Sequence, residues 1–254
     1  LHAAWNPKDL KASADRSRIM VLETALVRST DALDTYISWI RREPSLIQDA
    51  NLKNKIDKCG NSISDKFKIL REDCPTLDKR VAALIAVMII WRNKSVHSLS
   101  ENTVHKDDWH ALERNKEWIR VQFKGMEFDR LLGDFNKGGP PSFKETASFI
   151  RATQSTVEHL DMHYLQKIIP ALYLKSFLRF YMKELPPLQQ KKVVQSIWGQ
   201  DASVRKKKVI SFLVNNCGLS ADKKYAYSAT ITEDALDQLA HLTPKVFFEQ
   251  YMAD

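Results

Sequence analysis

Glycine is scarce in this chain, with seven among 254 residues. None of the seven belongs to a glycine-rich phosphate loop, a G-x-S-x-G nucleophile turn or a dinucleotide-binding fingerprint. These absences argue against the enzyme classes that depend on such loops. Strict alternation of apolar and polar residues is also rare, whereas helical spacing of apolar residues is common. The sequence therefore predicts an all-α protein.

Cysteine is equally scarce: Cys59, Cys74 and Cys217 form neither a C-x-x-C pair nor an even-numbered framework. This argues against a disulfide scaffold and a structural zinc site, and is typical of a reducing compartment. The longest apolar run, Val81 to Trp91, is too short to cross a bilayer. We expect a cytoplasmic protein without a membrane partner. No secretory leader is visible, although a sequence that starts at Leu1 is compatible with a longer chain.

The bulk composition indicates a folded protein with a basic surface. Apolar residues make up 44% of the chain and the formal net charge is +8. Residues 1–140 carry 24 Lys and Arg against 20 Asp and Glu, and residues 141–254 carry 15 against 11, so each part contributes +4. An excess of this size fits either an ordinary lysine-rich surface or a polyanionic partner.

Apolar spacing divides the chain into helices. Before residue 137 it predicts four: about 8–42, about 51–72, one containing Val81–Trp91 and capped by Thr76 or Asp78, and one that opens at Asp107 or Asp108 and includes Leu131. The third is apolar on nearly every face and should be the central, buried helix. Gly138-Gly139-Pro140-Pro141 must interrupt any helix, so we expect a helical bundle over 1–137 and a smaller helical region over 142–254. In the second region the spacing predicts helices near 143–165, 164–184, 187–198, 202–215, 233–241 and 244–252, with Tyr225–Ile231 as a short strand or link.

Polar residues follow the most apolar helix directly. Arg92 offers a planar fork of donors that matches phosphate oxygens. His97 can exchange a proton near neutral pH, since the reference pKa of histidine is about 6.5. Asn93 is four residues from His97 and shares its face if the helix continues. Charge stabilisation and proton transfer are what cleavage of a phosphodiester requires, so Arg92, Asn93 and His97 are the candidate catalytic residues.

The segment Arg92-Asn93-Lys94-Ser95-Val96-His97, at the end of a central bundle helix, resembles the R-N-x-x-x-H motif of the HEPN family (higher eukaryotes and prokaryotes nucleotide-binding domains). The resemblance covers about residues 8–137. It implies a helical bundle, metal-independent endoribonuclease activity without a cofactor, catalytic roles for Arg92 and His97, and a supporting role for Asn93. It also implies a homodimer whose two motifs face each other, and an RNA substrate. We expect Lys94, within the motif, to contact the nucleic acid.

Members of this family act as toxins of toxin–antitoxin pairs or in phage defence, so an antitoxin or an activating protein is a further implied partner. In one subgroup the motif continues as H-x-Y, and the tyrosine is modified by the antitoxin. Here Ser98 and Leu99 follow His97, and the resemblance does not support that mode of neutralisation. Other members are inactive, which leaves open a non-catalytic helical module that binds RNA, a nucleotide or a protein.

Two further groups of residues have a functional and an ordinary interpretation. Arg205, Lys206, Lys207 and Lys208 form a basic run that either contacts a nucleic-acid backbone or is a solvated helix face. His159 and His163 have the spacing of zinc ligands on a helix, but no H-E-x-x-H order or third ligand accompanies them. We interpret these histidines as surface residues and expect no metal site.

Overall fold

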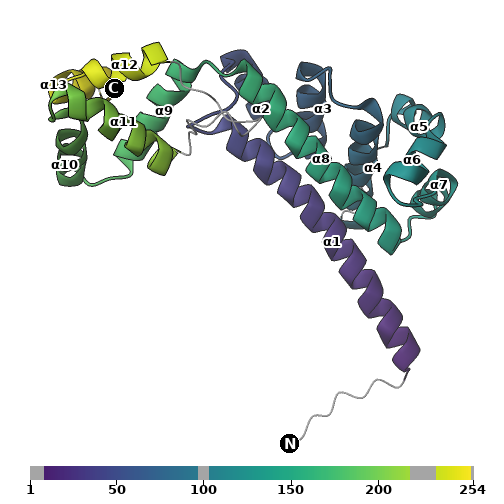
Figure 1. Ribbon diagram of the computed structural model, residues 1–254. Helices are drawn as coiled ribbons and strands as arrows, with labels where there is room; N and C mark the ends of the chain where they lie inside the picture. The colour runs from purple at the N-terminus through teal and green to yellow at the C-terminus, as the bar shows by residue number, and fades with distance from the viewer. Residues whose placement is uncertain (1–8, 97–102, 218–232, 253–254) are drawn as a thin grey trace, which may run out of the picture. The chain divides into compact units, whose positions relative to one another are not determined.

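The computed structural model describes residues 9–96, 103–217 and 233–252, and everything below refers to these residues. They form α-helices, one π-helical segment (η1) and no strand, which confirms the all-α class (Figure 1). The helices are α1 (Leu10–Arg41), α2 (Ala50–Lys58), α3 (Ile63–Asp73), α4 (Lys79–Val96), α5 (Lys106–Glu113), α6 (Lys116–Gln122), α7 (Phe128–Asn136), α8 (Phe143–Lys167), α9 (Pro170–Lys183), α10 (Pro187–Trp198), α11 (Ala202–Cys217), α12 (Glu233–His241) and α13 (Pro244–Phe247), followed by η1 (Phe248–Met252).

The chain divides into two compact units. The first comprises the described residues up to Ile37 together with those from Lys55 to Leu160, and the second comprises Ser38–Asn54 together with the described residues from Asp161 onward. The division therefore falls within α8, whereas the sequence suggested a boundary between 137 and 142. Gly138, Pro140 and Pro141 do end α7, because Gly138 takes a positive φ of 67° and the prolines cannot continue the helix. They do not end the compact unit.

Helix α4 is the centre of the first unit, as its sequence predicts. From Val81 to Trp91 every side chain except that of Ala86 is buried. Its neighbours include α3 and α5, and α8, from which the Thr153 hydroxyl lies 3.5 Å from the Met88 sulfur. Surrounded in this way, α4 has a fixed position and its last turn is set by the core.

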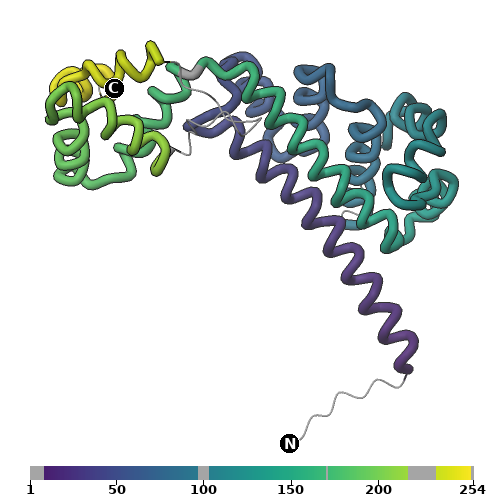
Figure 2. The backbone as a smooth tube through the Cα atoms, in the orientation of Figure 1, coloured from purple at the N-terminus to yellow at the C-terminus, as the bar shows by residue number. Residues whose placement is uncertain are grey.

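The long first helix packs on this core along only part of its length. Leu22, Leu26 and Leu33 are buried at helical spacing, which is the stripe that the sequence predicts. Toward its N-terminus Leu10, Met20 and Val21 are between 65% and 72% exposed. The N-terminal turns of α1 extend beyond the other helices of their unit (Figure 2). This part of α1 thus presents exposed apolar side chains, of which Met20 lines a cleft together with Ser95 and Val96 of α4.

Two predicted helices are each divided by a turn, and both single-helix predictions are wrong. The segment 51–72 contains α2 and α3, because Gly60 adopts a φ of 56° and Ser62 caps α3 by accepting from the amide of Asp65. The segment expected to open at Asp107 contains α5, α6 and α7. Lys124 and Gly125, with φ values of 50° and 87°, make the turn before α7. Apolar residues keep their spacing across these turns, so periodicity alone cannot detect them.

A capping box starts α8 after the glycine–proline segment. The Ser142 hydroxyl accepts from the amide of Glu145, and the Glu145 carboxylate accepts from the amide of Ser142 at 2.6 Å. Burial raises the pKa of the Glu145 carboxyl above its ordinary value, although the bonds from Ser142 act in the opposite direction. The neighbouring Gly139 carbonyl accepts from the indole nitrogen of Trp91 at 2.9 Å. The segment is thus tied to the end of α4.

The second unit has its own core, built from α9 to α13 and η1. The Trp198 ring stacks on Phe247 at 4.2 Å between centroids, and Phe247 stacks on Tyr251 at 5.1 Å. The indole nitrogen of Trp198 donates to the Leu239 carbonyl at 2.9 Å. The predicted helices near 187–198, 202–215 and 233–241 correspond to α10, α11 and α12. The predicted short element Tyr225–Ile231 lies outside the described residues.

No helix among the described residues is long and apolar enough to cross a membrane.

Candidate functional site

The packing of Trp91 fixes where Arg92 begins. The Trp91 ring is 2% exposed and meets the rings of Phe135 and Phe149 edge-on, at 5.5 and 6.0 Å between centroids. Together with its bond to Gly139, these contacts hold the last core turn of α4 from three directions. The backbone of Arg92 follows from this anchored residue, so the root of its side chain is rigidly placed.

The backbone of Arg92 is fixed by its neighbours, but its guanidinium has only long contacts. Its Nη1 donates to Oδ1 of Asn93 at 3.3 Å, and its Nη2 lies 3.5 Å from Oδ1 of Asp31 on α1. Its Nε is buried and has no hydrogen-bond partner among the described residues. The side chain is 23% exposed. An arginine can donate five hydrogen bonds, so this one retains donor capacity for a planar anion.

Asn93 and Lys94 extend the polar end of α4. Asn93 is half-buried, and its carbonyl oxygen accepts from Arg92. The Lys94 ammonium lies 4.2 Å from the centroid of the Phe135 ring, within the range of a cation–π interaction. Asn93 therefore orients Arg92, while Lys94 is directed over the aromatic cluster that also contacts Trp91. Neither contact excludes the predicted roles of these residues.

His97 lies outside the described residues, as do Ser98 and Leu99. The described part of α4 ends at Val96, so His97 is the next residue along the chain. Its predicted proximity to Arg92 stays a prediction.

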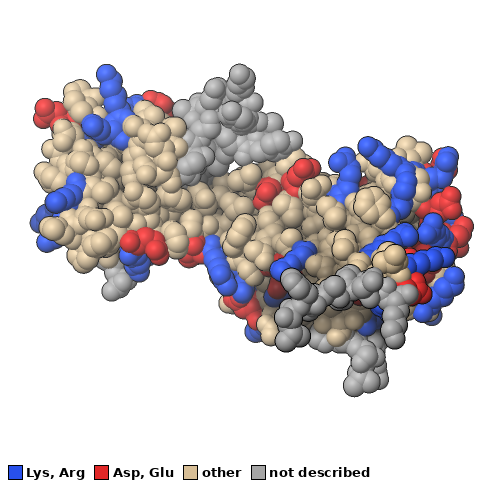
Figure 3. Space-filling model, turned by 90° about the horizontal axis from the view of Figure 1, so that it is seen from below, with Lys and Arg blue, Asp and Glu red and all other residues tan. Residues whose placement is uncertain are grey.

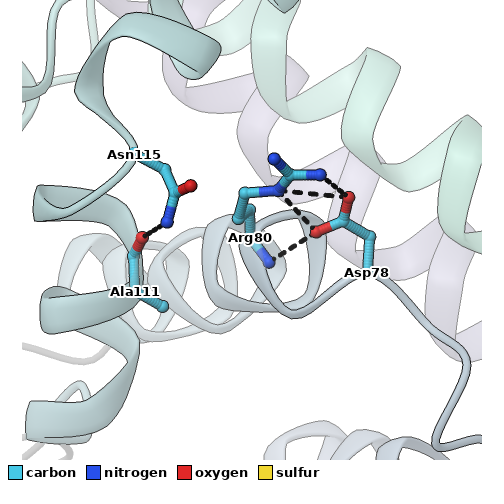
Figure 4. Close-up of polar contacts among 4 residues, drawn as sticks. All are labelled: Asp78, Arg80, Ala111 and Asn115. Atoms are coloured by element: carbon cyan, nitrogen blue, oxygen red, sulfur yellow. Dashed lines mark hydrogen bonds and ion pairs between the residues drawn. The ribbon is translucent and has the colours of Figure 1, made fainter.

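Helix α4 carries a second arginine near its other end, and that arginine has close carboxylate and aromatic partners. Arg80 forms a two-pronged pair with the Asp78 carboxylate, at 2.6 Å from Nη2 to Oδ2 and 3.0 Å from Nε to Oδ1 (Figure 4). Its guanidinium carbon also lies 3.8 Å from the centroid of the Trp118 ring. The hydrogen bonds from Arg80 lower the pKa of the Asp78 carboxyl below its ordinary value. Beside this pair, the Asn115 amide bonds to the Ala111 carbonyl at the end of α5.

The basic run on α11 is not uniform. Arg205 donates to the carbonyls of Gln200, Ala240 and Leu242, at distances of 2.8 to 3.2 Å. Lys206 pairs with Glu233 and with Asp237, the latter at 2.6 Å, and the hydrogen bonds that it donates to Asp237 and Glu233 raise the pKa of its ammonium group. Lys206 thus binds the first half of α12 to α11, and Arg205 binds its end and the residue after it.

The other half of the run faces solvent. Lys207 and Lys208 are exposed, with no hydrogen bond or ion pair among the described residues. Only these two residues of the run therefore offer an unengaged positive charge.

The two histidines with zinc-ligand spacing have other neighbours. His159 shares a hydrogen bond with the Thr76 hydroxyl at 3.1 Å, and the His163 ring meets the Tyr164 ring edge-on at 5.1 Å. Within the described ranges, no group of three or more His, Cys, Asp or Glu side chains is arranged to hold a metal ion. His105, near the motif in sequence, caps α5 by accepting from the amide of Asp107.

Surface charge alone does not locate a site. On the face displayed in Figure 3, Lys and Arg side chains are interspersed with Asp and Glu. Helices α5 to α7 illustrate this, since Lys116 pairs with Asp129 and Arg120 with Glu117. Burial and unsatisfied donors are therefore better guides than the density of positive charge.

Sequence reasoning missed one partner of the candidate site. Asp31 lies on α1, far from Arg92 in the sequence, and its carboxylate approaches the guanidinium only through the packing of α1 on α4. A favourable spacing signal exists only for residues of one helix, so no local pattern could have identified it.

The polar end of α4 thus combines a rigid backbone, an incompletely satisfied arginine and the start of the segment that carries His97. Comparison of the chain with protein-family models, with curated proteins and with solved structures gave no match. The resemblance to the HEPN family therefore depends on the residues from Arg92 to His97 and their place on the central helix.

Proposed function

We propose that this protein is a metal-independent RNA endonuclease of HEPN type, with Arg92, Asn93 and His97 as its catalytic residues. The observation that carries the proposal is the state of Arg92, which is rooted in the core but has a buried Nε without a partner and two long contacts. A buried donor without a partner is unfavourable, and a catalytic or ligand-binding role is one of the reasons for which structures retain such groups. The proposal also rests on the sequence motif.

In the proposed reaction a ribose 2′-oxygen attacks the adjacent phosphorus. The new O2′–P bond forms while the P–O5′ bond breaks, so the products are a 2′,3′-cyclic phosphate and a 5′-hydroxyl. His97 takes the proton from the 2′-hydroxyl or gives one to the departing 5′-oxygen. Arg92 stabilises the negative charge that accumulates on the phosphate oxygens. Asn93 keeps the guanidinium oriented through its bond to Nη1.

A homodimer is part of the proposal, because one motif contains a single histidine and the reaction needs both an acid and a base. Two copies related by a two-fold axis would bring both histidines to one phosphate. Light scattering at the concentration used for the assay should report a dimer. A fully active monomer would remove this part of the proposal. The biological setting that we propose is a toxin–antitoxin pair or phage defence.

A non-catalytic module that binds RNA, a nucleotide or a protein is the alternative. The pair between Arg92 and Asp31 favours it, because an arginine that already has a carboxylate partner can be a structural residue. The contact is long and both side chains are partly exposed, so its contribution to stability is about 0–1 kcal/mol. That weakness leaves the guanidinium open to exchange for a phosphate.

The test of the proposed function is cleavage of an RNA oligonucleotide by purified protein in excess chelator, with DNA of the same sequence as the control. We expect RNA fragments that end in a cyclic phosphate and a 5′-hydroxyl, and intact DNA, because DNA lacks the 2′-nucleophile. Fragments with 5′-phosphates, or activity that returns only with a divalent ion, would show that the mechanism is wrong. If RNA binds but is never cut, the binding module is the better account.

A further inference from the structure

Near Arg92, which does not itself line it, α1 and the last turn of α4 border an open cleft of about 460 Å³. Asp31 lines this cleft, and the same carboxylate contacts the Arg92 guanidinium. One turn earlier on α1, Arg28 lines it as well. The cleft therefore brings a second arginine, from a different helix, to the neighbourhood of the candidate catalytic residue.

Arg28 is one of the arginines of this unit that have no partner among the described residues. It is exposed, and no hydrogen bond or ion pair involves it within the described ranges. Arg71, Arg80 and Arg120, in contrast, each pair with a carboxylate at 2.6 to 2.8 Å. An unengaged guanidinium on the wall of a cleft has its donors available for a phosphate.

The rest of the cleft wall is partly apolar. Three apolar side chains line it: Met20, which is 70% exposed, Val96, which is 47% exposed, and Val27. Ser95 adds a hydroxyl from the last turn of α4. Two arginines next to exposed apolar side chains suit a nucleotide, whose phosphate needs donors and whose base needs an apolar surface.

Two carboxylates, Glu23 and Asp31, also line the cleft. With Arg28 and the adjacent Arg92 they make the empty site close to neutral. A phosphate that takes the position facing Nη2 of Arg92 therefore replaces Asp31, whose contact of 3.5 Å is weaker than an ordinary charged hydrogen bond.

We propose that this cleft is an RNA-binding subsite in which Arg28 and Arg92 hold one phosphate of the strand, Met20 and Val96 contact the adjoining base, and Asp31 is displaced when RNA binds. The inference rests on the proposed function. It adds a positioning residue, Arg28, from α1 and an internal competitor, Asp31.

The test is binding rather than cleavage, measured by fluorescence anisotropy with an RNA oligonucleotide that carries 2′-O-methyl groups and cannot react. The salt dependence of the dissociation constant is recorded for each variant. Arg28→Ala should weaken binding several-fold and reduce the salt slope by about one, the amount expected for one lost phosphate contact. Asp31→Asn should tighten binding by about 2–5-fold, because it removes a competing negative charge. Met20→Ala should weaken binding without a change in slope, since its contact is apolar.

Arg16→Ala is the matched control, because Arg16 is an exposed arginine on α1 that does not line the cleft. An equal effect of Arg16→Ala and Arg28→Ala would indicate diffuse attraction to α1 and overturn the subsite. So would an unchanged affinity in Arg28→Ala while Arg92→Ala weakens binding, which would leave the proposed function intact. Weaker binding by Asp31→Asn would show that Asp31 orients Arg92 and does not compete. If the unaltered protein does not bind RNA at all, the proposed function itself fails.

Discussion

The two ends of α4 each carry an arginine, and the two arginines are in opposite states. Arg80 has a carboxylate on its fork at 2.6 to 3.2 Å and an aromatic ring against its face. Arg92 has contacts of 3.3 and 3.5 Å and a buried Nε without a partner. The helix is the same and the residue type is the same, so the difference lies in the neighbours. We infer that the close partners of Arg80 stabilise the fold, whereas the long contacts of Arg92 leave it capacity for a ligand.

The largest expected effect concerns His97, in the segment that follows the Arg92 end of α4. His97→Ala should reduce RNA cleavage by about a hundredfold or more, which is the usual scale for loss of a general acid–base group. Single-turnover rates measure this directly. His110→Ala is the control, because His110 is an exposed histidine on α5. Equal rates for His97→Ala and the unaltered protein would remove His97 from the mechanism.

Arg80, at the N-terminal end of α4, should contribute to the stability of the fold. Arg80→Ala removes the pair with Asp78 and the contact with Trp118, and we expect the free energy of unfolding to fall by about 1–2 kcal/mol. Thermal or urea denaturation measures this loss. Lys79→Ala is the matched control, since Lys79 is an exposed neighbour without a partner in the described residues. Equal losses in the two variants would mean that the contacts of Arg80 contribute nothing.

The basic run on α11 also contains both engaged and unengaged positive charges. Lys207→Ala with Lys208→Ala should weaken RNA binding a few-fold and lower the salt slope by about one to two, because only these two lysines of the run are unengaged. Lys191→Ala with Lys192→Ala, on α10 of the same unit, controls for net charge. An identical slope in the unaltered protein and the Lys207–Lys208 variant would show that the run is a solvated helix face.

The smallest expected effect is a pH dependence of the stability that the pair of Asp78 and Arg80 contributes. Hydrogen bonds from Arg80 lower the pKa of Asp78 in the folded state below its ordinary value of 3.8. Stability from this pair is therefore fully present above 3.8 and is lost as the pH falls through the lowered folded pKa. Asp78→Asn should flatten the dependence of Tm on pH in that acid range. A parallel dependence in both proteins would contradict the assignment. The effect is small because the pair is about one-third exposed and is screened by solvent.

Much of the fold follows from the sequence, and the misses share a cause. The buried run from Val81 to Trp91 identifies the central helix, because only a helix surrounded by others can be apolar on nearly all faces. The turn at Gly60 was missed because Ile56 and Ile63 are buried seven residues apart, as they would be in one continuous helix. Apolar spacing reports which residues face the core and not whether the backbone between them is continuous.

The candidate site shows the same limit for polar residues. The motif identifies Arg92, because its residues are neighbours in the chain. Asp31 and Arg28 lie on another helix and meet Arg92 or its cleft only through tertiary packing. Likewise, Arg205 and Lys207 are equivalent in a charge pattern, yet one is bonded to the carbonyls at the end of α12 and the other is exposed. Which charges are already engaged is a property of the fold.

The most direct test of the account pairs the two arginines in one experiment, with the RNA cleavage rate and the Tm measured for Arg92→Ala and Arg80→Ala. Because Arg92 is proposed to stabilise the reacting phosphate, Arg92→Ala should lose about a hundredfold or more in rate with a Tm close to that of the unaltered protein. Arg80→Ala should show the reverse: a Tm lower by a few degrees and a nearly unchanged rate, measured well below its Tm. Two results for Arg92→Ala would contradict the claim that the Arg92 end of α4 is the site of the chemistry. One is RNA cleavage at the normal rate, and the other is the lowered Tm that is expected for Arg80→Ala.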